Sequence, residues 1–292
     1  MTVEGTNRAD EQLSLLGMEQ GSEGPEELGG ARIAYKDTST ILTRASGFMS
    51  DYDFTLNPYR GCAFGCPYCY AAFFTRDTAE QDSWGRWVEV KSNALAKLRR
   101  MRTPLEGARI YMSSVTDPYQ PIERHLQLVR SLLEELVNLQ PRLVVQTRSP
   151  LVTRDVDLLG QLRTVRVNMT VTTDDDEVRQ AFEPRCSPID ARLRAIAEVH
   201  EAGLPASITM TPLLPVADPT SFAQRLLATG VTHFVVQPFH TGRSRFVAGT
   251  GKAALAMVEE RSWTQERYRE TVEVLRALLP TLDEGREGFA PA

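Results

Sequence analysis

Apolar residues follow two different periods along the chain. Short runs rich in Val, Ile and Met, such as RLVVQT at 142–147 and TVRVNMTV at 164–171, are typical of buried strands. Longer segments place apolar residues at helical spacing. The segment 123–139 shows this spacing most clearly, with one stripe formed by Leu126, Val129, Leu132, Leu133 and Leu136.

The two patterns alternate over most of the chain. We predict strands at 55–61, 108–113, 142–147, 164–171, 206–211 and 232–237, and helices at 89–101, 123–139, 155–162, 189–202 and 219–228. This alternation indicates parallel βα units. A partial (β/α)6 barrel and a doubly wound sheet both fit, and both place functional residues in loops after the carboxyl ends of strands.

The two ends of the chain differ from this body. Residues 1–30 hold six Gly and seven acidic residues against one Arg, which predicts a disordered acidic tail. We expect a core over 40–240, an extension over 241–282 with a last helix at 263–279 that begins after Ser262, and a solvated tail over 283–292.

Charge and composition narrow the class of protein. The formal charge is -5 for the whole chain but +3 for residues 31–282, and a basic stretch at 86–109 lies beside Trp84 and Trp87. Such a stretch suits nucleic-acid contact, although an ordinary exposed helix face is the favoured explanation. No apolar run is long enough to span a membrane and no signal-peptide pattern is present, so we expect a cytoplasmic protein without a membrane segment.

Three of the four cysteines fall within eight residues. They are Cys62, Cys66 and Cys69 in RGCAFGCPYCYAA, where Gly61 and Gly65 permit a tight wrap. A reduced cytoplasmic chain favours a thiolate metal site over disulfides. Zinc structural sites close with four ligands, whereas an iron–sulfur cluster held by three thiolates leaves one iron open.

The motif resembles that of the radical S-adenosylmethionine (SAM) superfamily, C-x3-C-x-aromatic-C, with Tyr68 at the aromatic position. Further segments, SSVTDPYQPIE, VVQTRS, RDVDLL and EPRCSPIDARLRAIAEVHEAGLP, resemble the spore photoproduct lyase-like branch, often labelled DNA repair photolyase. The resemblance covers about 40–240 and implies an α/β fold with a partial (β/α)6 TIM-type barrel as the radical SAM core.

The resemblance also implies an activity. A 4Fe–4S cluster bound by Cys62, Cys66 and Cys69 would reductively cleave SAM to a 5′-deoxyadenosyl radical, which abstracts hydrogen from a substrate. The electron would come from a donor such as flavodoxin or ferredoxin. The substrate is undetermined, and a nucleic-acid base is the leading candidate. One alternative is radical modification of a peptide or small metabolite. The other is a non-catalytic zinc or iron–sulfur module that binds nucleic acid, with Cys186 or His240 completing the site.

The resemblance assigns cosubstrate contacts to strand ends. Tyr68 would cover the cluster and the adenine, and Arg148 would pair with the methionyl carboxylate. Hydroxyl and carbonyl oxygens at Ser113, Ser114 and Thr116 suit the SAM ammonium group. Two amides are candidates for the ribose hydroxyls, Asn168 and, as a weaker candidate, Gln237.

One position departs from spore photoproduct lyase itself. Ser114 stands where that enzyme has a Cys that returns hydrogen to the product radical. An alcohol O–H bond is too strong for this step, so we predict that the chain is not a thymine photoproduct lyase. The hydrogen would then come from Cys186, Tyr70 or Tyr119, from a recovered 5′-deoxyadenosine, or from no donor, if the product radical is oxidised instead.

Overall fold

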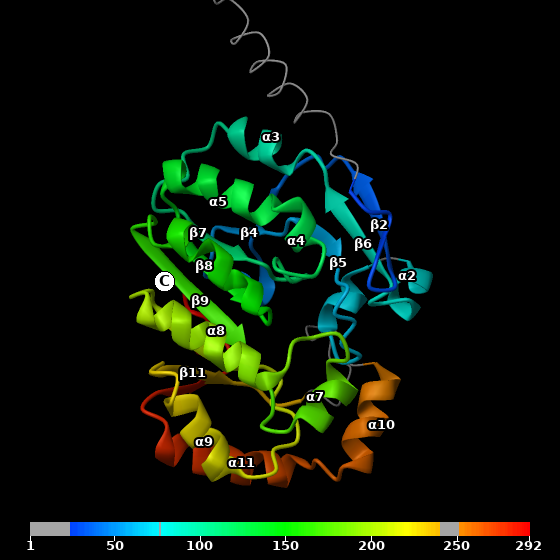
Figure 1. Ribbon diagram of the computed structural model, residues 1–292, viewed down its shortest axis with the longest axis vertical. Coiled ribbons are helices and arrows are strands. Elements are labelled where there is room, and N and C mark those ends of the chain that lie inside the picture. The colour runs from blue at the N-terminus through cyan, green and yellow to red at the C-terminus, as the bar shows by residue number, and fades with distance from the viewer. Residues whose placement is uncertain (1–23, 76, 240–250) are drawn as a thin grey trace, which may run out of the picture.

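A curved eight-stranded sheet forms the centre of the computed structural model, which describes residues 24–75, 77–239 and 251–292 (Figure 1). Seven of its strands are parallel, and six of these form its middle: β4 (Phe54–Leu56), β7 (Arg109–Met112), β8 (Arg142–Thr147), β9 (Thr164–Thr170), β10 (Ala206–Met210) and β11 (His233–Val236). Strand β3 (Leu42–Arg44) is antiparallel to β4 at one edge, and β12 (Leu282–Glu284) is parallel to β11 at the other. This arrangement confirms the predicted partial barrel.

The two faces of this sheet have different compositions because successive side chains on a strand point to opposite sides. One face packs under the helices with residues such as Ile110, Val145, Val167 and Ile208, all fully buried. The opposite face is largely polar. It carries a hydrogen-bonded row in which the Tyr111 hydroxyl donates to Gln146 at 2.9 Å and the Gln146 amide donates to Thr170 and Thr209.

Helices cover the outer face of the sheet (Figure 1). They are α4 (Glu123–Leu126), α5 (Leu128–Leu139), α6 (Val156–Leu159), α7 (Asp176–Phe182), α8 (Ile189–Glu201) and α9 (Pro219–Leu227), with the 3-10 helix η3 (Pro150–Asp155) before α6. The continuous helix predicted at 123–139 is broken at Gln127, whose φ of 49° is left-handed. The helix predicted at 155–162 is a 3-10 turn followed by one α turn.

A second, four-stranded sheet lies beside the barrel in the order β1-β2-β6-β5. Its strands are β1 (Glu27–Leu28), β2 (Ala31–Lys36), β6 (Trp87–Lys91) and β5 (Tyr59–Gly61), and the short helices α2 (Thr78–Asp82) and α3 (Ala94–Arg99) flank β6. The predicted helix at 89–101 is therefore wrong over its first part, because Val88 and Val90 alternate with Glu89 and pair with β2 and β5. The predicted tail is also too long, since β1 falls within residues 1–30.

The C-terminal region adds two helices to the molecule, and its last residues cover the starts of β8 and β9. It contains α10 (Lys252–Glu260), α11 (Gln265–Leu278), β12 and the 3-10 helix η4 (Glu287–Phe289). Helix α11 begins after Thr264, whose hydroxyl accepts from the Arg267 amide, and not after Ser262. The solvated tail predicted at 283–292 is wrong, because Phe289 is buried against Tyr52 and its carbonyl accepts from the Tyr52 hydroxyl at 2.8 Å.

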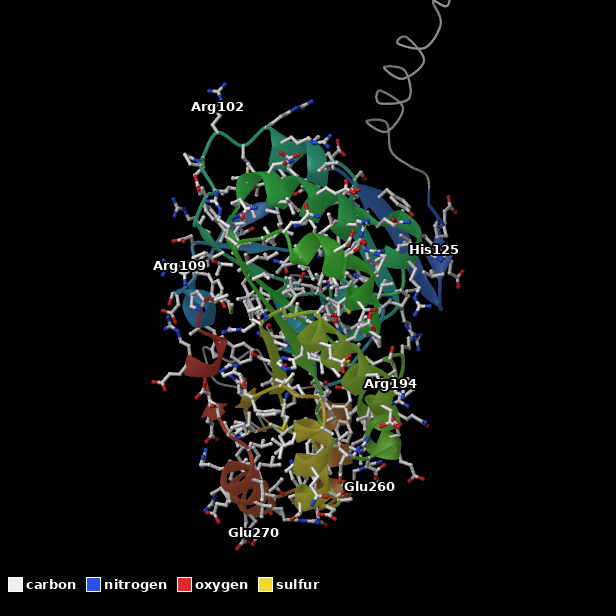
Figure 2. All side chains as sticks on the ribbon, turned by 60° about the vertical axis from the view of Figure 1, so that its left-hand side comes forward. Arg102, Arg109, His125, Arg194, Glu260 and Glu270 are labelled. Carbon is white, nitrogen blue, oxygen red and sulfur yellow. The ribbon has the colours of Figure 1, made fainter. Side chains whose placement is uncertain are left out.

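Charged side chains such as Arg102, Arg194 and Glu270 point outward from the surface (Figure 2). No helix in the described ranges is long and apolar enough to cross a membrane. The 3-10 helices η1 (Gly47–Met49) and η2 (Tyr70–Phe74) complete the elements.

Candidate active site

The three clustered cysteines lie in the loop that leaves β5. Cys62 and Cys66 are buried, Cys69 is partly buried, and all four cysteines of the chain are free thiols. Gly61 allows the chain to enter this loop, since its φ is 76° and a Cβ there would lie 2.6 Å from the Trp87 backbone oxygen. The loop therefore folds closely over β6.

Gln120 holds this loop from the neighbouring β7 connection. Its side-chain oxygen accepts from the Ala63 amide at 2.9 Å, and its amide donates to the Thr116 hydroxyl at 3.2 Å. The Thr116 hydroxyl in turn donates to the Gly61 carbonyl at 2.6 Å. Thr116, predicted as a cosubstrate contact, thus already holds the cysteine loop in place.

The backbone of the predicted Ser113–Thr116 segment is fixed by Asn57. The Asn57 side-chain oxygen accepts from the Ser114 amide at 2.9 Å and from the Val115 amide at 3.2 Å. Ser113 is buried, and the Ser114 carbonyl accepts from the Tyr70 hydroxyl. The segment therefore lies beside the cysteine loop, and the Tyr70 side chain joins the two.

Asp117 joins the ends of β7 and β8. Its carboxylate accepts from the Tyr119 amide and the Arg148 amide, each at 2.9 Å, and from the Thr147 hydroxyl at 2.7 Å. Burial raises the pKa of Asp117, while these hydrogen bonds act in the opposite direction. The carboxylate thereby fixes the backbone that carries Arg148.

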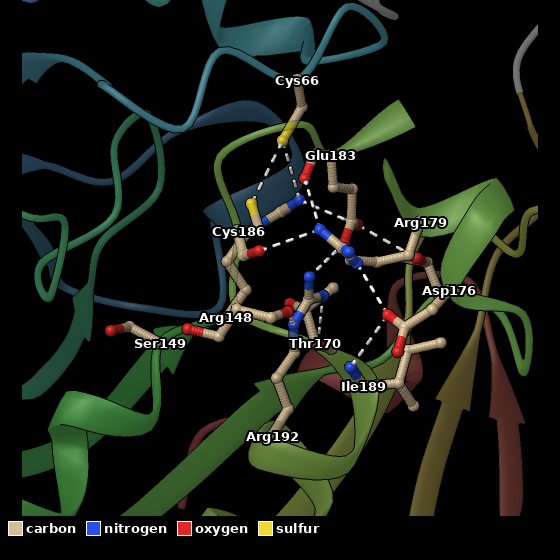
Figure 3. Close-up of polar contacts among 12 residues, drawn as sticks. Cys66, Arg148, Ser149, Thr170, Asp176, Arg179, Glu183, Cys186, Ile189 and Arg192 are labelled. Carbon is tan, nitrogen blue, oxygen red and sulfur yellow. Dashed lines mark hydrogen bonds and ion pairs between the residues drawn. The ribbon is translucent and has the colours of Figure 1, made fainter. Parts of the chain in front are cut away.

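Arg148 reaches the cysteine loop through one nitrogen (Figure 3). Its Nη1 donates to the Tyr68 hydroxyl at 2.6 Å, to Glu183 Oε1 at 3.1 Å and to Cys66 Sγ at 3.2 Å. The guanidinium carbon lies 5.8 Å from the centroid of the Tyr68 ring. Arg148 and Tyr68, both predicted from the resemblance, are thus in direct contact.

Glu183 was missed by sequence reasoning. It is fully buried, and its carboxylate also accepts from the Tyr68 hydroxyl and lies 2.5 Å from Arg192 Nη2. Burial acts to raise the pKa of Glu183, but the charges of Arg192 and Arg148 outweigh it and bring the pKa to about 2. The sequence signal for this residue was weak: Glu183 and Arg192 both occur in the segment EPRCSPIDAR, which leads into an amphipathic helix.

Cys186 is the fourth thiol near this network. Its Sγ lies 3.8 Å from Cys66 Sγ (Figure 3). The contact with Cys186 lowers the pKa of the Cys66 thiol, the charge of Arg148 adds to this effect, and burial opposes it. Burial raises the pKa of Cys186 itself. The structure therefore brings this candidate hydrogen donor to the cysteine loop.

Other predicted residues lie elsewhere. Tyr119 is buried under Arg154, whose guanidinium carbon lies 5.9 Å from the Tyr119 ring centroid. Asn168 is fully buried on the polar face of β9, where Arg166 donates to its oxygen at 3.2 Å and its Nδ2 has no partner in the described part of the chain. Gln237 follows β11, and its backbone N–H donates to the Met210 carbonyl.

The basic stretch does not form one free surface. Arg99 pairs with Glu135 at 3.1 Å, and Arg109 pairs with Asp53 at 2.9 Å. Arg102 points away from the molecule at the end farthest from α11 (Figure 2). These placements favour the interpretation of an ordinary charged surface.

The thiols fit an iron–sulfur cluster by their chemistry. They are free and they share one loop. Burial raises the pKa of both Cys62 and Cys69, and the charge of the nearby Cys66 adds to this effect. Within the ranges that the structure describes, no three His, Cys, Asp or Glu side chains are arranged to hold a metal ion as they stand.

A model of the radical SAM superfamily matches residues 56–226, which is more than half of the chain and includes the cysteine loop. The chain belongs to the radical SAM superfamily. This membership favours an enzyme over the alternative of a non-catalytic metal module.

Two curated relatives illustrate the range of the family. An uncharacterised protein of Methanocaldococcus jannaschii is 32% identical over 162 residues, covering 56% of this chain and 61% of that protein. A radical SAM Nalpha-GlyT isomerase of Pseudomonas phage M6 is 26% identical over 192 residues, covering 64% of this chain and 39% of that protein. The chain thus spans less than two thirds of the length of either relative.

Among solved structures, a mutant of spore photoproduct lyase with dinucleoside spore photoproduct has a TM-score of 0.61 at 16% identity, covering 94% of this chain and 92% of that one. Another mutant of the lyase, with bound AdoMet and the same photoproduct, has a TM-score of 0.57. At this identity the likeness shows the fold, and it agrees with the branch that the sequence resembles.

Proposed function

We propose that Cys62, Cys66 and Cys69 bind one 4Fe–4S cluster and that the neighbouring residues bind SAM for radical generation. The observation that carries this proposal is the contact of Arg148 with both Cys66 and Tyr68, which places a cation directly beside the three-thiol loop. Bound there, the cluster would supply the electron that cleaves the sulfonium C–S bond of SAM.

The residues of the chain position the cosubstrate. Arg148 provides the positive charge for the methionyl carboxylate, and oxygens of Ser113 and Ser114 accept from the ammonium group. The Tyr68 ring belongs to the cysteine loop and lies beside Arg148, where it would shield the reacting atoms from water. Asp117, Asn57 and Gln120 hold the strand ends on which these groups stand.

For the substrate, we propose a nucleic-acid base. The fold likeness to a lyase solved with a dinucleoside photoproduct supports this class, and the family match to an isomerase supports rearrangement as well as lyase-like cleavage. Ser114 argues against thymine photoproduct repair itself. Cys186 is the favoured hydrogen donor because it lies at the cysteine loop, whereas Tyr119 is buried in another cluster.

The experiment is anaerobic reconstitution with iron and sulfide, reduction with dithionite, and measurement of 5′-deoxyadenosine with and without DNA or RNA. We expect about four irons per chain, as a 4Fe–4S cluster requires, and 5′-deoxyadenosine that increases with one of the nucleic acids. Zinc in place of iron would contradict the cluster assignment. A flavodoxin or ferredoxin that replaces dithionite would identify the class of electron donor.

A further inference from the structure

The Glu183 carboxylate connects four parts of the chain that are distant in sequence. Its Oε1 accepts from Tyr68 in the cysteine loop, from Arg148 after β8 at 3.1 Å, and from the Thr172 hydroxyl after β9 at 3.0 Å. Its Oε2 faces Arg192 of α8. No water-exposed surface remains on the Glu183 side chain, so these contacts determine where each partner lies.

The hydrogen bonds of Arg148 show which edge of the guanidinium is used. Glu183, Tyr68 and Cys66 all accept from Nη1, whereas Nε and Nη2 make no hydrogen bond to the part of the chain that the structure describes. A guanidinium binds a carboxylate best through two adjacent nitrogens. The Nε and Nη2 edge therefore stays available for a carboxylate ligand.

Arg192 explains why Glu183 does not neutralise Arg148. It is fully buried, its Nε donates to the Ser187 carbonyl at 2.9 Å, and its Nη1 donates to the Thr170 carbonyl at 3.2 Å. Arg192 is thus fixed to the backbone, and its charge balances that of Glu183. One positive charge remains on Arg148 for a ligand.

We propose that Glu183 is a positioning residue that holds Arg148 by Nη1, so that its Nε and Nη2 edge receives the methionyl carboxylate of SAM, while Arg192 balances the Glu183 charge. This inference rests on the proposed placement of SAM beside Arg148. It assigns a role to a residue that contacts neither the cosubstrate nor the cluster.

The test compares Glu183→Gln with Glu123→Gln. Glu123 is an equally buried carboxylate that accepts from a tyrosine, Tyr59, and from an arginine, Arg154, but it lies in a different cluster. Each variant replaces one buried carboxylate by an amide, and the two carboxylates belong to different clusters. Equilibrium binding of SAM and of decarboxylated SAM to the anaerobically reconstituted proteins is measured together with iron content.

We expect Glu183→Gln to bind SAM at least tenfold more weakly than the natural chain, and to bind decarboxylated SAM within twofold of it. Glu123→Gln should bind both ligands normally at unchanged iron content. Because Glu183 acts through Arg148, the double variant Glu183→Gln with Arg148→Ala should bind SAM no more weakly than Arg148→Ala alone. A purely structural role would lower the affinity for both ligands and add to the effect of Arg148→Ala.

Normal SAM affinity in folded Glu183→Gln, or an equal loss for both ligands, would overturn the inference. If circular dichroism shows that the single variant does not fold, Glu183→Gln with Arg192→Gln removes both buried charges and takes its place under the same criteria. A natural chain that binds no SAM would overturn the proposed function and this inference together. SAM binding by the natural chain without the selective loss overturns the inference alone.

Discussion

Replacing Gln120 by Leu tests the contact that holds the cysteine loop. Leu has nearly the same size but cannot hydrogen-bond, so the buried Ala63 amide loses its acceptor and Thr116 loses a donor. A buried donor without a partner costs about 1 to 3 kcal/mol, and a lost neutral hydrogen bond costs about 0.5 to 1.5 kcal/mol. The extra apolar surface of Leu offsets part of this, so we expect unfolding to be easier by about 2 kcal/mol.

The loop should also bind its cluster less well. Urea denaturation of the cluster-free chain measures the first effect, and iron content after reconstitution and brief exposure to air measures the second. Thr116→Val is the matched partial change, because it keeps the Ala63 acceptor while it removes the hydrogen bonds of the Thr116 hydroxyl to Gly61 and from Gln120. Its stability and iron retention should fall between those of the other two proteins. A Gln120→Leu chain within about 0.5 kcal/mol of the natural one, with equal iron retention, would refute the reasoning.

Three further predictions concern the same region. Replacing any one of the three loop cysteines by Ala should abolish cluster binding, as measured by iron content and absorbance, whereas Cys186→Ala should retain the cluster; loss of iron in Cys186→Ala would show a fourth protein ligand. The natural chain should convert a spore-photoproduct dinucleotide slowly or with side products, and Ser114→Cys should improve the yield of the two thymines. Efficient turnover of the dinucleotide by the natural chain would contradict this prediction. The pKa of Glu183 is lowered to about 2, so the ionised carboxylate stabilises the folded chain above the pKa of an unfolded Glu, and this stabilisation is lost as pH falls toward 2. Acid unfolding should therefore begin in this pH window and be less steep in Glu183→Gln. Equal acid profiles of the two proteins would contradict the assignment.

The fold was predictable where one face of an element is uniformly apolar. Strands such as β8 and β9 are buried on the helix-covered face, and their runs of Val and Met mark them plainly. The sequence does not predict the strand β6. Its alternating WVEVK pattern runs directly into the apolar stripe of α3, and together the two segments resemble one helix. Its strand conformation depends on pairing with β2 and β5, which are distant in sequence.

The site was predictable where a spacing carries chemistry. The cysteine loop and Arg148 follow from local motifs, and the structure brings them together. Glu183 could not be found in this way, since its role depends on Tyr68, which lies 115 residues earlier in the chain. Phe289 was likewise hidden, because a short segment rich in Gly and Glu shows its burial only once the barrel exists to receive it.

The segment around Phe289 covers one end of the barrel interior. Arg142 and Arg166, at the starts of β8 and β9, donate to the carbonyls of Ala292 and Ala290, so the floor of the barrel is covered by backbone that these arginines hold in place. The cysteine loop and the ends of β7 and β8 stand at the opposite rim. We therefore expect the cosubstrate and the substrate to reach the proposed site from the rim that carries the cysteine loop, so that both use the same side of the barrel for entry and release.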